Sequence, residues 1–160
     1  MTTDSSPPYR TYATLVASFG AGLTAVAGLA TLLGRQPERL TSLDLAVLSA
    51  ATFKASRTIT SDEVTSFIRD PFVKGEAHEG KEEAVEDGGP KQALGELLTC
   101  SRCIGAWTAA GLVSAHVLAP RAGRLLSWSL AASAANDFLQ AGFAALTAKS
   151  NELEQRAGDD

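Results

Sequence analysis

Three long segments of the chain are almost free of charged side chains, and this distribution constrains the fold more than any average property does. Of 14 Lys and Arg plus 18 Asp and Glu residues, none lies in 12–33 or 104–119, and only Asp137 lies in 125–148. An α-helix rises about 1.5 Å per residue, so roughly 20 apolar residues cross a hydrocarbon core of about 30 Å. These gaps therefore predict membrane-spanning helices.

A fourth segment, which ends near Ile59, is the weakest spanning candidate. Thr41 with Asp44 three residues later forms the capping-box pattern that opens a helix. This helix carries Asp44, Lys54 and Arg57, so it either crosses the bilayer or lies on or within the protein. With it, the sequence predicts an all-α integral membrane protein of about four transmembrane helices.

The first apolar segment also resembles a secretory signal. It is too long for the apolar region of a signal peptide, however, and Gly34-Arg35-Gln36-Pro37 is not a typical cleavage site. We therefore expect a retained helix. The domain prediction is a disordered tail over 1–11, a four-helix membrane domain over 12–149, and a polar tail over 150–160.

The central region between the second and third helices is polar. Val64, Phe67 and Ile68 have helical spacing before Pro71, which predicts a short amphipathic helix at the membrane surface. The acidic stretch 74–91 lacks aromatic residues, and we predict a disordered loop there because it can bury little apolar surface.

Basic residues predict the orientation. The tails and the central loop hold eight Lys and Arg residues, against four in the two short turns between helices. Because cytoplasmic loops are enriched in Lys and Arg, we expect a multi-pass protein of the cell membrane with both termini in the cytoplasm.

Composition also bears on partners. A net charge of −4 argues against a nucleic-acid partner, which needs a basic surface. Gly20, Thr24 and Gly28 recur every fourth residue, a pattern that lets membrane helices approach closely but is also common in membrane helices generally. The expected partners are membrane lipids and either a second copy of the chain or another membrane protein.

Cys100 and Cys103, the only two cysteines, lie at the predicted start of the third helix. Helix N-termini favour the thiolate form of cysteine. The spacing fits a redox dithiol, half of a zinc site completed by a second chain, or structural thiols. His116 lies 13 residues further along the helix, which argues against a zinc site within one chain, and no other cofactor is predicted.

Lys54 and Asp137 lie on two different helices that both begin at the outer side, and we predict similar depths of about 16 and 18 Å from that side. A charge inside a bilayer is costly unless it is paired, so we expect these two side chains to meet. The pair either joins two helices or lies on a proton or ion path.

A second group of charges, Arg57, Asp62, Arg69 and Asp70, surrounds the inner end of the second helix. These residues either bind an anionic lipid headgroup or a partner protein, or are solvated charges at the bilayer surface. No nucleophile with a base, phosphate loop or carboxylate pair is recognisable, which favours a protein that is not an enzyme.

Several motifs together resemble a family of small bacterial membrane proteins known as domain of unknown function 1360, some of which are associated with sporulation. The motifs are Lys54-x-x-Arg57, Thr60-x-Asp62-Glu63, Ile68-Arg69-Asp70-Pro71-Phe72 and Cys100-Ser101-Arg102-Cys103-Ile104-Gly105-Ala106-Trp107. The resemblance implies membrane embedding and adds Trp107 to the candidate functional residues, but it names no reaction.

The sequence thus predicts an interaction or structural module within a membrane complex. The alternative is a membrane thiol-redox or metal-binding protein that uses Cys100 and Cys103. Because the helices are rich in Ala and only weakly hydrophobic, a soluble helical bundle is a third hypothesis.

Overall fold

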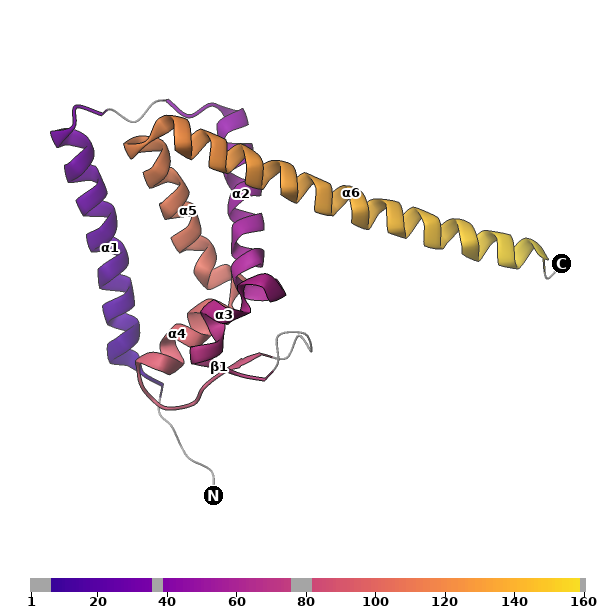
Figure 1. Cartoon of the computed structure of the whole chain (residues 1–160), viewed down its shortest axis with the longest axis horizontal. Helices are drawn as coiled ribbons and strands as arrows, with labels where there is room; N and C mark the ends of the chain where they lie inside the picture. Colours follow the sequence, from indigo (N-terminus) through magenta and orange to yellow (C-terminus); the bar gives the residue numbers. More distant parts are fainter. Residues whose placement is uncertain (1–6, 36–38, 76–81, 159–160) are drawn as a thin grey trace, which may run out of the picture.

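The computed structural model describes residues 7–35, 39–75 and 82–158, and its fold is all-helical as predicted (Figure 1). Two short 3₁₀ turns flank α3, and a two-stranded antiparallel hairpin precedes α4. The elements are α1 (Tyr9–Leu32), α2 (Ser42–Ser61), a turn (Glu63–Thr65), α3 (Ser66–Arg69), a turn (Asp70–Phe72), β1 (Val73–Lys74), β2 (Glu83–Ala84), α4 (Pro90–Thr99), α5 (Ser101–Leu118) and α6 (Pro120–Gly158).

α2 begins at the predicted cap. The Thr41 backbone N–H donates to the Asp44 carboxylate at 2.9 Å, and the Asp44 N–H donates to the Thr41 hydroxyl at 3.2 Å, which completes the capping box. Further along, the hydroxyls of Ser56 and Thr108 lie 2.9 Å apart and join α2 to α5. The two helices run side by side in opposite directions (Figure 1).

A close approach between backbones fixes the start of α6 against the end of α5. Gly123 is buried, and a Cβ atom added there would lie 2.6 Å from the backbone nitrogen of His116. Only glycine allows this contact without displacement of one helix.

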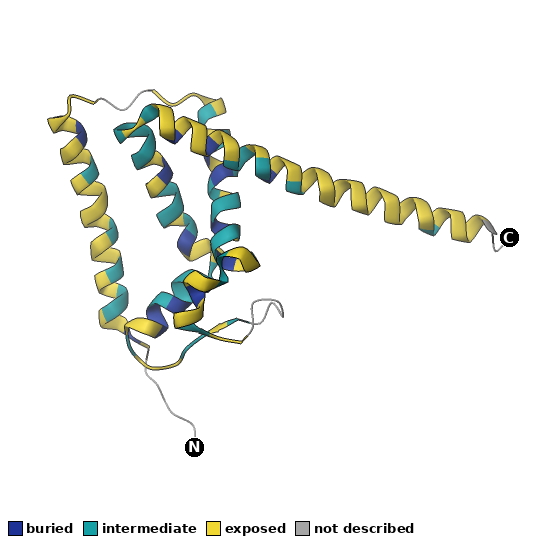
Figure 2. Cartoon of the chain, viewed as in Figure 1, coloured by how far each residue is buried: buried dark blue, intermediate teal, exposed yellow. Residues whose placement is uncertain are grey.

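The hydrophobic core is small. It consists of Leu48, Ala51 and Leu112, with Leu130 and Ala131 packed against it. Large apolar side chains lie mostly on the outside, among them Leu23, Leu29, Leu43, Leu45, Val113, Leu125, Trp128, Leu139 and Leu146. Figure 2 shows that α1 and the distal half of α6 are exposed along most of their length.

Within the described residues, α1 is the one helix long and apolar enough to cross a membrane. A single helix of this kind near the N-terminus is weak evidence, since signal sequences and core helices share its properties. The length and apolar composition of the described helices therefore do not support the prediction of four spanning helices. Charged and polar side chains account for the difference: Lys54 and Arg57 in α2, Arg102 and His116 in α5, and Asp137 in α6.

The acidic segment 74–91 was predicted to be disordered, and for its described residues this prediction is wrong. Val73 pairs with Ala84 and Lys74 with Glu83, and α4 begins at Pro90. Tertiary contacts hold the segment: a Cβ atom added at Gly95 of α4 would lie 3.0 Å from the Cβ atom of Ala84, and the Val85 N–H donates to the Phe72 carbonyl at 3.1 Å. Residues 76–81 lie outside the described residues.

The first and last helices both extend into segments that were predicted to be tails. α1 begins at Tyr9, directly after Pro8, and residues 1–6 lie outside the described residues. At the other end, the predicted polar tail continues α6 to Gly158. Glu152 forms ion pairs with Lys149 at 2.9 Å and with Arg156 at 2.5 Å, and such pairs at helical spacing support a helix.

α6 packs on the bundle with its first half only. Gly123, Ser127 and Ala134 are buried, and this face ends at half-buried Asp137. From Phe138 to Ala157 every residue except Glu152 is exposed. The distal half of α6 thus projects away from the other helices (Figure 1).

Candidate functional site

Cys100 and Cys103 form a disulfide where α4 ends and α5 begins. Cys100 is the N-cap of α5, and its Sγ accepts a hydrogen bond of 3.2 Å from the backbone N–H of Cys103. Cys103 is exposed, whereas Cys100 is half-buried. Cys103 is therefore the more accessible residue of the disulfide.

Metal ligation was an alternative prediction for these cysteines. Among the described residues, no group of three or more His, Cys, Asp and Glu side chains is placed to hold a metal ion. A zinc site would require both sulfurs to be reduced and a second chain to supply the remaining ligands. The shared zinc site stays a prediction.

Trp107 follows Cys103 by one helical turn and contacts α1. Its ring lies edge-to-face with Phe19 at a centroid distance of 5.1 Å. Nearer the N-terminus of α1, the Tyr12 hydroxyl donates to the Glu96 carboxylate of α4. These two contacts hold α1 against α4 and α5 around an apolar pocket of about 350 Å³, and Cys103 lines that pocket.

The predicted contact between Lys54 and Asp137 is present. The Lys54 ammonium donates to a carboxylate oxygen of Asp137 at 2.8 Å, and the rings of Phe53 and Phe138 stack beside the pair at 5.5 Å. The Lys54 side chain is 19% exposed and that of Asp137 is 44% exposed. The pair joins α2 to α6 at the point where α6 leaves the bundle.

Arg69 was predicted to be near the protein surface, but its side chain is completely buried. Its guanidinium donates to the Glu82 carboxylate at 2.6 and 3.3 Å, to the carbonyl oxygens of Ile59 and Asp62 at 2.7 and 3.2 Å, and to the Thr65 hydroxyl at 3.0 Å. Arg69 thereby joins the end of α2 to the hairpin. Asp62 contributes its backbone carbonyl to this cluster.

Two members of this cluster were missed by sequence analysis. Glu82 lies within the acidic stretch, where no pattern distinguishes it from its neighbours. The Thr65 hydroxyl donates to the carbonyl oxygens of Thr58 and Asp62, and this requires the turn after α2 that sequence spacing did not predict. Polar residues close to a buried arginine are identifiable only once the chain reversal is known.

Arg57 lies apart from this cluster and is exposed. Together with Arg102 and Ser101 it lines one end of a groove of about 590 Å³ between α2 and α5. The charged residues predicted at the inner end of α2 therefore do not form one site. Arg69 belongs to a buried cluster, whereas Arg57 is exposed at the end of the groove.

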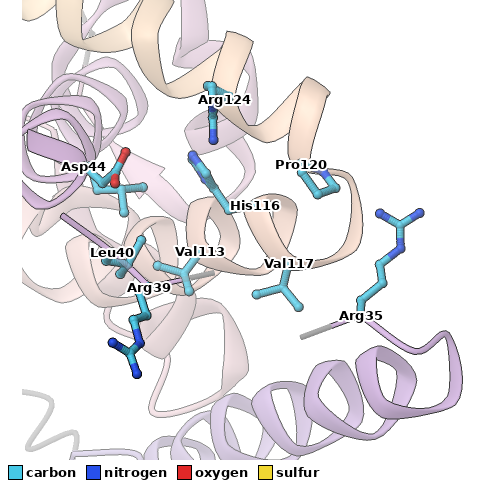
Figure 3. Close-up of a pocket in the computed structure, with 10 residues that line it drawn as sticks. Arg35, Arg39, Leu40, Asp44, Val113, His116, Val117, Pro120 and Arg124 are labelled. Carbon is cyan, nitrogen blue, oxygen red and sulfur yellow. The ribbon is translucent and has the colours of Figure 1, made fainter. Parts of the chain in front are cut away.

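A third pocket, of about 210 Å³, lies at the opposite end of the bundle (Figure 3). The side chains of His116 and Arg124 point toward one another there, close to Asp44, whereas Arg35 and Arg39 point away. The ring nitrogen Nδ1 of His116 lies 3.0 Å from the Leu112 carbonyl oxygen within the same helix. His116 is therefore a hydrogen-bonded helix residue.

Comparisons with known proteins match more than half of the chain to one family. A family model described as "Protein of unknown function (DUF1360)" matches residues 47–143 of the 160. This region contains all of the predicted site residues, whereas α1 lies outside it. No solved structure matches the chain.

Two curated relatives come from Bacillus subtilis (strain 168). "Sporulation protein YjcA" is 31% identical over 103 residues, which cover 58% of this chain and 83% of the relative. "UPF0713 protein YngL" is 29% identical over 110 residues, which cover 64% of this chain and 80% of the relative. From the family match and these relatives, the chain belongs to the DUF1360 family of proteins of unknown function.

Proposed function

We propose that this chain is a multi-pass membrane protein that acts as a structural or interaction module. The observation that supports this proposal most strongly is the separation of small side chains between helices from large apolar side chains on the outside. Small residues such as Ala51, Ala134 and Ser127 are fully or almost fully buried between helices, while most large apolar side chains face outward. Membrane helices pack in this way because lipid covers the apolar outer surface.

The exposed face of α1 supports an interaction role. Gly20, Thr24 and Gly28 are exposed, and a Cβ atom added at either glycine would have no heavy atom within 4 Å. Such a face lets a second helix approach closely. The double substitution Gly20→Leu and Gly28→Leu is expected to weaken self-association in lipid nanodiscs. Unchanged self-association would show that α1 does not form the interface.

Membrane extraction tests the main proposal. We expect the protein to stay with membranes through carbonate and high-salt washing, because spanning helices rather than surface charges hold it. Recovery in the soluble fraction without detergent would refute the proposal.

Cysteine labelling tests the number and direction of the spans. In a variant without Cys100 and Cys103, single cysteines are introduced by Ser5→Cys, Ala122→Cys and Ala157→Cys. An impermeant maleimide is expected to label Ala122→Cys on intact cells and the two terminal variants only after permeabilisation, as positive-inside counting indicates. A terminus labelled on intact cells would show that one helix does not span.

Thiol–disulfide exchange is a second candidate function, and the disulfide at the N-cap of α5 is the observation that favours it. A substrate thiolate would attack the exposed Cys103 sulfur, and Cys100 would leave as a thiolate stabilised by the Cys103 N–H and the helix N-terminus. The second substrate thiol then releases the mixed disulfide. The substrate loses two electrons and two protons, and both cysteines become thiols.

Trapping separates this function from the alternatives. In the reverse direction of this exchange, the Cys103 thiolate of Cys100→Ser attacks the disulfide of an oxidised partner and releases one partner thiol. Without Cys100 to resolve it, the mixed disulfide is expected to accumulate, and Cys103→Ser is the matched control that accumulates few. If the reduced protein instead binds about one zinc ion per two chains, the cysteines form a shared metal site. If neither trapped partners nor bound zinc is found, the disulfide between Cys100 and Cys103 has a structural role only.

A further inference from the structure

The α2–α5 groove is an elongated depression whose two ends differ in chemistry. Its volume is about 590 Å³. Its lining consists of Leu40, Leu45, Leu48, Ser49, Thr52, Phe53, Ser56 and Arg57 on the α2 side and Ser101, Arg102, Gly105, Ala109 and Val113 on the α5 side. Because α2 and α5 run in opposite directions, Arg57 and Arg102 share one end, and Leu45 and Val113 share the other.

The walls of the groove offer little to a polar ligand. The Ser49 hydroxyl donates to the Leu45 carbonyl at 2.8 Å, and the Ser56 hydroxyl donates to the Thr52 carbonyl at 2.7 Å. Both hydroxyls are therefore satisfied within their own helix. Gly105 and Ala109 supply the depth of the groove, since neither carries a large side chain.

The charged end has the opposite character. Arg57 and Arg102 are exposed, and neither guanidinium has an ion pair or hydrogen bond with any residue that the structure describes. Two guanidinium groups that have no partner among the described residues, at one end of an apolar depression, attract a phosphate-like anion.

The dimensions fit a lipid chain. From Leu45 to Arg57 is 12 residues, or about 18 Å of helix. One leaflet is half of a hydrocarbon core of about 30 Å, so an acyl chain extends about 15 Å from its headgroup. The volume lies within the range of small-molecule sites, roughly 300 to 1,000 Å³, which favours a single chain over a helix.

We propose that the α2–α5 groove binds one acyl chain of an anionic phospholipid, whose phosphate pairs with Arg57 and Arg102. This inference rests on the proposed membrane location, because the groove then opens to lipid and its charged end lies at the headgroup level. An anionic lipid satisfies both ends at once. A zwitterionic lipid adds a cationic group beside the two arginines and is bound less tightly.

Native mass spectrometry of the full-length protein in detergent tests the site, with equal amounts of phosphatidylglycerol and phosphatidylcholine added. We expect the wild type to retain one phosphatidylglycerol with a preference of about tenfold or more, since each surface arginine attracts anionic lipid. The double variant Arg57→Gln and Arg102→Gln is expected to lose this preference. The matched control, Arg10→Gln with Lys91→Gln, removes two cations outside the groove and is expected to keep it.

Two further arms test the acyl chain. Val113→Trp fills the apolar end without altering charge and is expected to reduce retention of both lipids, with its thermal unfolding midpoint measured to confirm folding. Glycerol phosphate, the headgroup without chains, is expected not to compete, whereas competition would identify a site for free phosphate and overturn the proposal.

Equal retention of both lipids by the wild type would also overturn the proposal, as would unchanged retention by Val113→Trp. Carbonate extraction of the same protein separates the two ideas. Soluble protein refutes the membrane proposal, while membrane-bound protein without lipid preference refutes the groove alone.

Discussion

At the scale of single residues, Arg69 stands out because its charge is buried and yet fully used. Each of its three guanidinium nitrogens donates at least one hydrogen bond, and the Glu82 carboxylate balances its charge. A buried ion pair becomes costly when one partner is removed, because the remaining charge is left without compensation. Arg69 and Glu82 are therefore structural residues of the turn after α2.

Arg69→Ala is expected to lower the free energy of unfolding by about 3–5 kcal/mol, the range measured for broken buried pairs. The measurement is chemical unfolding of the purified protein in detergent. Arg156→Ala removes an exposed arginine that also pairs with a glutamate, and little change is expected there. Equal effects of the two substitutions would show that Arg69 is not buried.

A double-mutant cycle tests the pair between Lys54 and Asp137. Each single change, Lys54→Met or Asp137→Leu, is expected to destabilise the protein because it isolates one charge. The double variant is expected to recover much of the loss, as thermal unfolding in nanodiscs would show. Strictly additive losses would mean that the two side chains do not interact.

These two pairs show what the sequence can predict about contacts. Lys54 and Asp137 were paired correctly because helix geometry fixes their depth and each helix carries few other charges. Arg69 and Glu82 were not paired, since Glu82 is one of several acidic residues in a stretch whose composition indicates disorder. Depth along a helix is encoded locally, whereas the path of a loop is not.

At the scale of elements, the glycine at position 123 marks a close backbone contact between α5 and α6. Gly123→Ala is expected to separate α5 from α6, because the new Cβ atom would lie 2.6 Å from a backbone nitrogen. The expected result is a clearly lower thermal unfolding midpoint.

Gly142→Ala is the matched control, since it lies in the same helix with no heavy atom within 4 Å of the added Cβ atom. Alanine favours a helix interior over glycine by roughly 0.5–1 kcal/mol, so this change is expected to be neutral or stabilising. A loss of stability at Gly142 equal to that at Gly123 would contradict the close contact.

The helices themselves were largely predictable, and the small elements were not. The cap at Thr41 and the helix start near Cys100 were recognised from local pattern, and both are observed. The two-residue strands β1 and β2 were missed because such short strands have no periodicity and depend on packing against α4. The end of α6 was predicted too early, because a polar composition was taken for a tail although its charges pair at helical spacing.

At the scale of the whole molecule, the bundle and the distal half of α6 are structurally independent. Truncation after Gln140 removes a segment whose described side chains are exposed apart from half-buried Glu152, and it is expected to leave the unfolding midpoint unchanged. Truncation after Leu130 also removes buried Ala134 and the ion-pair partner of Lys54, and is expected to lower the midpoint. A similar loss in both truncations would indicate that the distal half contacts the bundle.

The ion pair between α2 and α6 also bears on how the chain is made. Its two residues are separated by 83 positions. At a synthesis rate of about 5–20 residues per second, the ribosome produces Asp137 roughly 4 to 17 seconds after Lys54. During this interval the Lys54 ammonium lacks its ion-pair partner Asp137, so we expect α2 to wait at the translocon or at the membrane surface until α6 emerges.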